Sequence, residues 1–109
     1  MNRKSISDPV KNQVEDIVKR FNASEMEDSN CFYLTRYRGR FLYLDRKEYG
    51  SVSNICRLEY TGDMENWYFA IYKYSDGRYD PEEILFPGDQ HVDGTIEGAM
   101  RAGLEAYPD

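Results

Sequence analysis

Residues 31–74 read CFYLTRYRGRFLYLDRKEYGSVSNICRLEYTGDMENWYFAIYKY and hold 12 of the 16 aromatic side chains of the chain. Turn-forming residues interrupt this stretch at short intervals, and the segments between them are rich in β-branched and aromatic residues. Such spacing is typical of an antiparallel meander. The stretch predicts four strands, over residues 31–37, 40–46, 52–60 and 67–74.

The turns between the first three predicted strands are short. Arg38-Gly39 suits a two-residue hairpin turn, which would pair Tyr37 with Arg40. The residues from Lys47 to Gly50 fit a type I turn closed by a glycine with positive φ. Consecutive strands are therefore expected to be neighbours in the sheet.

Helical periodicity precedes and follows the aromatic stretch. Asp8 and Pro9 are typical of an N-cap and a first helical residue, and apolar side chains then recur three and four positions apart. We expect a helix over 9–22 and a second helix capped by Asp93. The predicted fold class is α+β, with an N-terminal helix, a four-stranded antiparallel β-meander and a C-terminal helix, both helices packed on one face of the sheet.

Length and charge restrict the class of protein. The 109 residues allow one domain over 1–109, of which residues 1–8 are expected to be flexible. The net charge of −6 disfavours non-specific binding to nucleic acid or to an anionic membrane. No apolar run is long enough to span a membrane, and the N-terminus lacks the apolar stretch of a signal peptide. We expect a cytoplasmic protein.

The charge is distributed unevenly along the chain. Residues 79–109 contain eight acidic and one basic side chain, a sum of −7, whereas residues 1–78 contain 13 basic and 12 acidic side chains, a sum of +1. Five basic side chains lie between Arg36 and Lys47. They suit an anion or a protein partner, although solvated charges on turns explain the same pattern.

The predicted sheet is apolar on both faces. A sheet covered by helices on one face should alternate apolar and polar residues, and three of the four predicted strands do not. One face of the first hairpin carries Phe32, Leu34, Phe41 and Tyr43, and the other carries Tyr33, Tyr37, Leu42 and Leu44. The second face therefore requires a cover, for which the 78–92 connection, a second copy of the chain, a ligand and a protein partner all remain open.

Tyrosine and arginine side chains suit a surface that binds another protein. Tyrosine combines an apolar ring with a polar tip, and both residue types are enriched at interface hot spots. The candidate partner-binding residues are Tyr33, Tyr37, Arg38, Arg40, Tyr68, Tyr72 and Tyr74. The sequence thus favours a small acidic binding or adaptor module for a protein partner or for self-association.

Two other functions remain open at this point. Gly98 and Gly103 keep the second helix thin, which leaves room for a small-ligand pocket between sheet and helix. A metal-dependent enzyme is the other alternative, because Asp89, His91 and Asp93 alternate and would face one way in an extended segment. Motifs for phosphate binding or nucleophilic catalysis are absent from the sequence, which indicates no cofactor.

Overall fold

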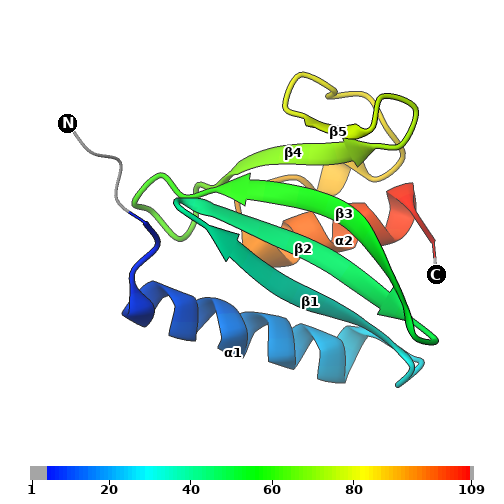
Figure 1. Ribbon diagram of the computed structural model, residues 1–109, viewed down its shortest axis with the longest axis horizontal. Helices are drawn as coiled ribbons and strands as arrows, with labels where there is room; N and C mark the ends of the chain where they lie inside the picture. Colours follow the sequence, from blue (N-terminus) through cyan, green and yellow to red (C-terminus); the bar gives the residue numbers. More distant parts are fainter. Residues whose placement is uncertain (1–4, 109) are drawn as a thin grey trace.

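The computed structural model describes residues 5–108 and confirms the α+β class, with five strands rather than four (Figure 1). The fifth strand is a short one that follows the predicted four. The elements are α1 (Asp8–Glu25), β1 (Cys31–Arg38), β2 (Phe41–Glu48), β3 (Ser51–Glu59), β4 (Tyr68–Lys73), β5 (Arg78–Asp80), the 3₁₀ turn η1 (Asp89–His91) and α2 (Ile96–Ala106).

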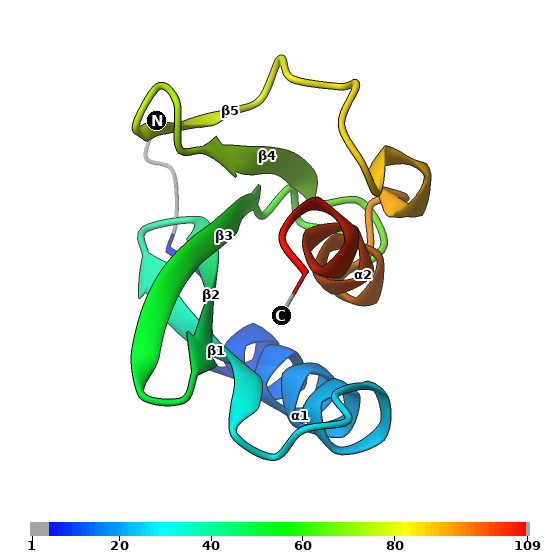
Figure 2. The same cartoon turned by 90° about the vertical axis from the view of Figure 1, so that its right-hand side faces the viewer.

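The five strands form one antiparallel sheet in the order β1-β2-β3-β4-β5. Both helices lie on the same side of this sheet, as Figure 2 shows, with α1 against β1 and α2 against β3. We call the side covered by the helices the inner face and the opposite side the outer face. Figure 1 is viewed from the outer face, with α2 behind the strands.

The first hairpin turns one residue later than the sequence predicts. Arg38 pairs with Phe41, so Gly39 and Arg40 form the two-residue turn, and Gly39 adopts the positive φ of 59° that this turn requires. Tyr37 consequently pairs with Leu42 rather than with Arg40. This is a shift of two residues, which preserves the face to which every side chain points.

A β-bulge adds one residue to β3. Leu44 pairs with Cys56 and Asp45 with Asn54, so Ile55 has no partner in β2. Both Ile55 and Cys56 have an exposed fraction of 0%. The bulge thereby lets two successive residues of one strand contribute to the core.

The fifth strand was absent from the prediction because it has only three residues. Ser75-Asp76-Gly77, which directly follow the predicted fourth strand, belong to a hairpin loop that reverses the chain, with Gly77 at a φ of 66°. Lys73 pairs with Arg78 across this loop. The sheet is therefore wider by one strand at the side opposite β1.

The core fills the space between the inner face and the two helices. Ile6, just ahead of α1, is also buried and donates its backbone N–H to the carbonyl of Gly39 at 3.0 Å. Of the terminal residues 1–8, residues 5–8 thus belong to the packed domain, and residues 1–4 lie outside the described residues. Core side chains from the helices are Val14, Val18, Phe21, Ile96, Ala99 and Met100.

The N-caps of both helices differ from the predicted residues. Ser7 caps α1 in place of Asp8 by accepting the backbone N–H of Val10. Thr95 caps α2 in place of Asp93, which instead binds the Thr95 hydroxyl and N–H. Between residues 5 and 108, neither helix combines the length and the apolar character that crossing a membrane would need.

Candidate functional site

Tyr33 and Tyr37 lie on the inner face, so the structure removes both from the predicted exposed surface. The exposed fraction of Tyr33 is 2%, and its hydroxyl donates to the Met100 carbonyl of α2 at 2.7 Å. Tyr37 donates to a carboxylate oxygen of Glu15 in α1 at 2.7 Å, and burial raises the pKa of Tyr37. Both tyrosines therefore attach the helices to the sheet.

The two predicted arginines have different environments. Arg38 is exposed at the end of β1, on the outer face. Arg40 lies in the hairpin turn, donates to the Tyr60 carbonyl at 2.6 Å and forms an ion pair with Glu59 at 3.2 Å. Arg38 is thus available on the surface, whereas Arg40 ties the turn to the end of β3.

Five rings form a continuous row across the outer face, which we call the aromatic row. Successive ring centroids are separated by 6.3, 5.3, 4.9 and 4.8 Å, in the range of favourable aromatic pairs. The exposed fraction of Tyr74 is 54%, and its ring continues to Tyr107 at 5.3 Å. The aromatic row consists of Phe41, Tyr43, Tyr79, Tyr72 and Tyr74.

The row brings together two predicted site residues, Tyr72 and Tyr74, with residues that the sequence analysis left out of the site. Tyr68 lies on the same face, is 60% exposed and stands nearer the other end of β4. The sequence analysis placed Phe41 and Tyr43 on the face opposite Tyr33 and Tyr37 and did not select them. Tyr79 could not be selected, because its place in the sheet depends on the unpredicted strand β5.

Two guanidinium groups lie over the aromatic row. Arg36 is 4.6 Å from the Tyr43 ring centroid, and Arg57 is 4.5 Å from that of Phe41 and 5.6 Å from that of Tyr79. Cation–π contacts of this kind are attractive and fix the planes of both groups. The aromatic row therefore has charged hydrogen-bond donors directly above three of its rings.

The carboxylate of Asp45 holds Arg36 in place. Arg36 donates from Nε at 2.7 Å and from Nη2 at 3.2 Å to the two oxygens of Asp45, which is 5% exposed. This hydrogen bonding raises the pKa of Arg36. Burial raises the pKa of Tyr79 to about 12, so its hydroxyl, which accepts from Arg36 at 3.4 Å, stays neutral at pH 7.

The outer face is positive although the protein as a whole is negative. It carries four cationic side chains and two carboxylates, a sum of +2, against a net charge of −6 for the chain. Such a local field attracts an acidic surface. The charged residues are Arg36, Arg38, Lys47, Arg57, Asp45 and Glu59.

The 78–92 connection leaves the outer face open. Within it, Tyr79 joins the outer face as part of β5. Phe86 stacks on Phe69 of the inner face, with centroids 5.8 Å apart, and Ile84 and Leu85 are exposed by 71% and 79%. Of the four residues of this segment expected to form a cover, Tyr79 contributes to the outer face, whereas Phe86 packs on the inner face and Ile84 and Leu85 are exposed.

The sheet and α2 are in direct contact where the sequence analysis left room for a ligand. A Cβ on Gly103 would lie 2.5 Å from Cγ2 of Ile55 and 2.6 Å from the hydroxyl oxygen of Tyr33. A Cβ on Gly98 would lie 2.4 Å from the His91 carbonyl oxygen. Because both glycines are needed for close packing, they create no pocket at these positions.

Asp89, His91 and Asp93 do not converge on a common point. The segment forms the 3₁₀ turn η1 instead of the extended chain that would align them. His91 contacts Glu105, and Asp93 accepts hydrogen bonds from Thr95. Within residues 5–108 no group of three potential metal-ligating side chains is assembled.

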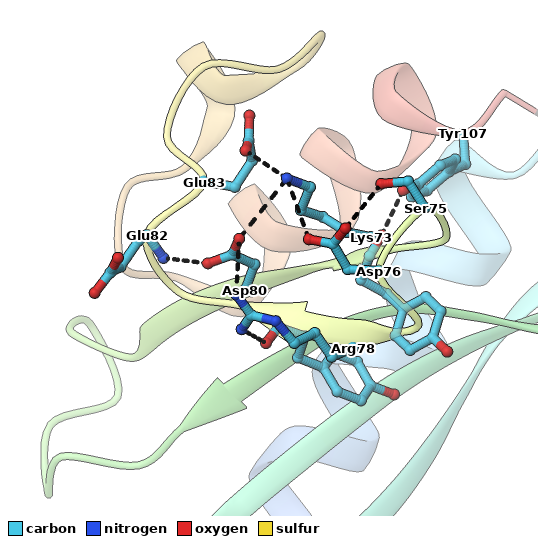
Figure 3. Close-up of polar contacts among 10 residues, drawn as sticks. Lys73, Ser75, Asp76, Arg78, Asp80, Glu82, Glu83 and Tyr107 are labelled. Atoms are coloured by element: carbon cyan, nitrogen blue, oxygen red, sulfur yellow. Dashed lines mark hydrogen bonds and ion pairs between the residues drawn. The ribbon is translucent and has the colours of Figure 1, made fainter.

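A lysine surrounded by carboxylates fixes the β4–β5 hairpin (Figure 3). The ammonium nitrogen of Lys73 lies 3.1 Å from Glu83, 3.6 Å from Asp76 and 3.8 Å from Asp80. The hydrogen bond to Glu83 raises the pKa of Lys73. This network joins the start of the 81–92 connection to the sheet, and its sequence signal was the acidic cluster after Arg78.

No protein-family model, curated protein or solved structure matches the chain.

Proposed function

We propose that this protein is a binding module whose outer sheet face docks onto the surface of a partner protein. The observation that carries the proposal is the aromatic row with Arg36 and Arg57 above it. Of the described residues outside the sheet, Tyr107 packs its ring against Tyr74 at one end of this row. Apolar rings and arginines that remain at a surface are the components of interface hot spots.

The outer face is arranged before any partner binds. Asp45 fixes Arg36 through two hydrogen bonds, and Arg57 lies against two rings. Side chains that are already ordered lose little conformational entropy on association. The surface therefore supports binding without a large rearrangement.

The charge of the outer face favours an acidic partner protein over a second copy of the chain. A two-fold dimer through this face would place the same patch against itself. The +2 sum would then oppose a +2 sum, and like charges across an interface disfavour association. The proposal also includes a cytoplasmic location, which the buried free thiol of Cys56 supports, because thiols persist in reducing compartments.

Alanine substitution at the centre of the aromatic row tests the proposal. We expect Tyr72→Ala to weaken partner binding by about 1–3 kcal/mol, because the ring contributes contact area at the middle of the face. The measurement is quantitative affinity capture from the host cell followed by native mass spectrometry of the captured complex. The matched control, Tyr49→Ala, removes the same side chain from the β2–β3 turn, where it is 70% exposed.

Two results would contradict the proposal. One is equal recovery of the partner by the two variants. The other is loss of the folded state in Tyr72→Ala, measured by circular dichroism, because the face would then be part of the core. If the protein forms a homodimer and Tyr72→Ala dissociates it, the partner of the outer face is a second copy of the chain.

A further inference from the structure

One edge of β4 has no neighbouring strand along half of its length. β3 pairs with β4 from Tyr68 to Ile71, whereas β5 pairs only with residues 71–73. Among the described residues, the stretch Tyr68–Ala70 thus has a strand on one side only. Such an edge is a template for pairing with another chain.

The sequence after β5 turns the chain away from this edge. The N–H of Glu82 donates to the side chain of Asp80 at 3.0 Å (Figure 3). The N–H of Glu83 donates to the Asp80 carbonyl oxygen at 3.4 Å. Pro81, which lies between Asp80 and Glu82, has no backbone N–H that could pair with β4. Because the chain turns at Asp80 and Pro81, β5 does not continue alongside Tyr68–Ala70.

The backbone groups of Phe69 point toward the open edge. The carbonyl of Lys73 accepts the N–H of Gly77 at 2.8 Å, so Lys73 directs its backbone groups to the β5 side. Alternate residues of a strand direct these groups the same way. Phe69, four residues before Lys73, thus presents one donor and one acceptor between the end of β5 and Trp67, whose N–H donates to the Gly94 carbonyl at 2.8 Å.

A groove of about 520 Å³ runs alongside this edge, between β4 and the 81–92 connection. Its apolar wall includes the stacked pair Phe69 and Phe86. Trp67 also lines it, and its indole N–H is buried without a hydrogen-bond partner in the part of the chain that the structure describes. Ile84, exposed by 71%, stands at the outer margin.

The groove has a negative rim. Its lining includes the carboxylates Glu59, Glu83 and Asp89 and, among the described residues, no cationic side chain. Arg40 pairs with Glu59, and Lys73 divides its charge among Glu83 and two further carboxylates. The groove lining and its ion-pair partners together have a charge of −2. They comprise five carboxylates and three cations, namely Glu59, Asp76, Asp80, Glu83 and Asp89 with Arg40, Lys73 and Arg78.

We propose that the open edge of β4 binds an extended, basic segment of a partner protein as an added strand. The backbone of the segment would pair with Phe69, an apolar side chain would enter the groove against Phe86, and the alternate basic side chains would face Glu59 and Asp89. Strand addition combines main-chain hydrogen bonds with pockets for alternate side chains in this way. The acidic rim disfavours a second copy, whose own rim would meet it.

The groove shares Glu59 and Tyr68 with the outer face but is lined by none of the rings of the aromatic row, and the inference does not rest on the proposed function. The aromatic row binds with its rings and takes an acidic partner, whereas the groove binds with a strand edge and takes a basic one. A test can therefore address the groove alone, with Tyr72→Ala as a variant that leaves it intact.

The probe is a nine-residue peptide in which lysine alternates with valine and phenylalanine, titrated into the ¹⁵N-labelled full chain. We expect saturable amide shifts centred on Phe69 and Ala70. A version N-methylated at alternate residues cannot pair along one edge and is expected to bind at least about tenfold more weakly. A version with glutamate in place of lysine is expected not to bind.

Two neighbouring substitutions provide the matched comparison. Ile84→Lys places a cation at the groove and is expected to weaken peptide binding at least about tenfold. Leu85→Lys adds the same charge one residue away, at a side chain that is 79% exposed and does not line the groove, and is expected to change the affinity less than about twofold. Tyr72→Ala is expected to leave the affinity unchanged.

Four outcomes would overturn the proposal. They are the absence of shifts at millimolar peptide, equal binding of the N-methylated peptide, shifts centred on the aromatic row, and equal effects of the two lysine variants. Shifts at Phe69 that depend on the concentration of the protein alone would assign the edge to a second copy instead.

Discussion

Arg46 is buried, although its place in a cluster of basic residues would favour an exposed side chain. It belongs to the basic cluster between residues 36 and 47, yet only 2% of it is exposed. It donates to the carbonyls of Gly103 and Tyr107 at the C-terminal end of α2 and pairs with Glu48 at 2.9 Å. The guanidinium adds a donor at the Gly103 carbonyl, which also accepts the N–H of Tyr107, and its positive charge complements the helix dipole.

Removing this guanidinium is expected to destabilise the fold. Arg46→Ala leaves the end of α2 without its donor and opens a cavity, so we expect the free energy of unfolding to fall by about 2–4 kcal/mol. Urea denaturation followed by circular dichroism measures the change. Arg38→Ala, in the same cluster but exposed, should change stability by less than about 0.5 kcal/mol. Equal effects of the two variants would contradict the structural role given to Arg46.

Among the elements, α2 can approach the sheet closely because its contact residue, Gly103, has no side chain. Gly103 faces Ile55, the extra residue of the β-bulge, and the hydroxyl of Tyr33. Glycine within a helix costs about 1 kcal/mol relative to alanine. Here the cost is offset by the burial of the inner face and by the hydrogen bond from Tyr33 to Met100.

Gly103→Ala is expected to destabilise the protein despite the higher helix propensity of alanine. The new Cβ would lie 2.5 Å from Ile55 and 2.6 Å from the Tyr33 hydroxyl, so α2 must shift. Overpacking of this kind typically costs about 1–3 kcal/mol. The urea midpoint gives the sign, and stabilisation by Gly103→Ala would show that the helix moves freely.

A double-mutant cycle with Ile55→Ala locates the origin of that cost. Removing Cγ2 of Ile55 makes room for the new methyl group, so the second substitution should be less costly in the Ile55→Ala background than in the wild type. Additive effects of Gly103→Ala and Ile55→Ala would place the strain elsewhere, such as at Tyr33.

The sequence predicts the larger elements well because their periodicity is strong. The apolar spacing indicates α1, and alternation together with turn residues indicates the first four strands. Strand β5 is too short for a pattern, and its pairing depends on the Lys73 network. The hairpin register was also wrong, but an even shift does not alter the faces.

The candidate site was only partly predictable for a different reason. Alternation separates Tyr33 from Phe32, but it does not say which face the helices cover. That choice is made by tertiary contacts, such as Tyr33 with Met100 and Tyr37 with Glu15. The sequence therefore predicts that both faces of the sheet carry aromatic side chains. In the structure, two of the selected tyrosines, Tyr33 and Tyr37, lie on the inner face.

At the scale of the whole molecule, acid should destabilise the fold. The two helices are joined by Arg101 and Glu25, with a distance of 2.7 Å, and this hydrogen bond lowers the pKa of Glu25. Hydrogen bonds from Thr95 and from His91 lower the pKa values of Asp93 and Glu105. A carboxyl group whose pKa is lowered in the folded state stabilises it above the unfolded pKa and loses that contribution as pH falls through the folded value.

We therefore expect the urea midpoint to be nearly constant from pH 7 to about 5 and to fall below about pH 4.5, where unfolded carboxyl groups begin to bind protons. Circular dichroism at a series of pH values measures it. Glu25→Gln should lower the midpoint at pH 7 and make its pH dependence shallower. A midpoint that rises on acidification would contradict this account.

The hydrogen bond between Tyr33 and Met100, which spans 67 residues of sequence, has a consequence for the growing chain. Every strand of the sheet pairs with its neighbour in sequence, so the hairpins can form early from local contacts. The helix α2, which buries Tyr33 and Ile55, is synthesised after all five strands of the sheet. Until it leaves the ribosome, a preformed sheet displays an apolar surface, and we expect this interval to be the one in which the nascent chain depends most on chaperones.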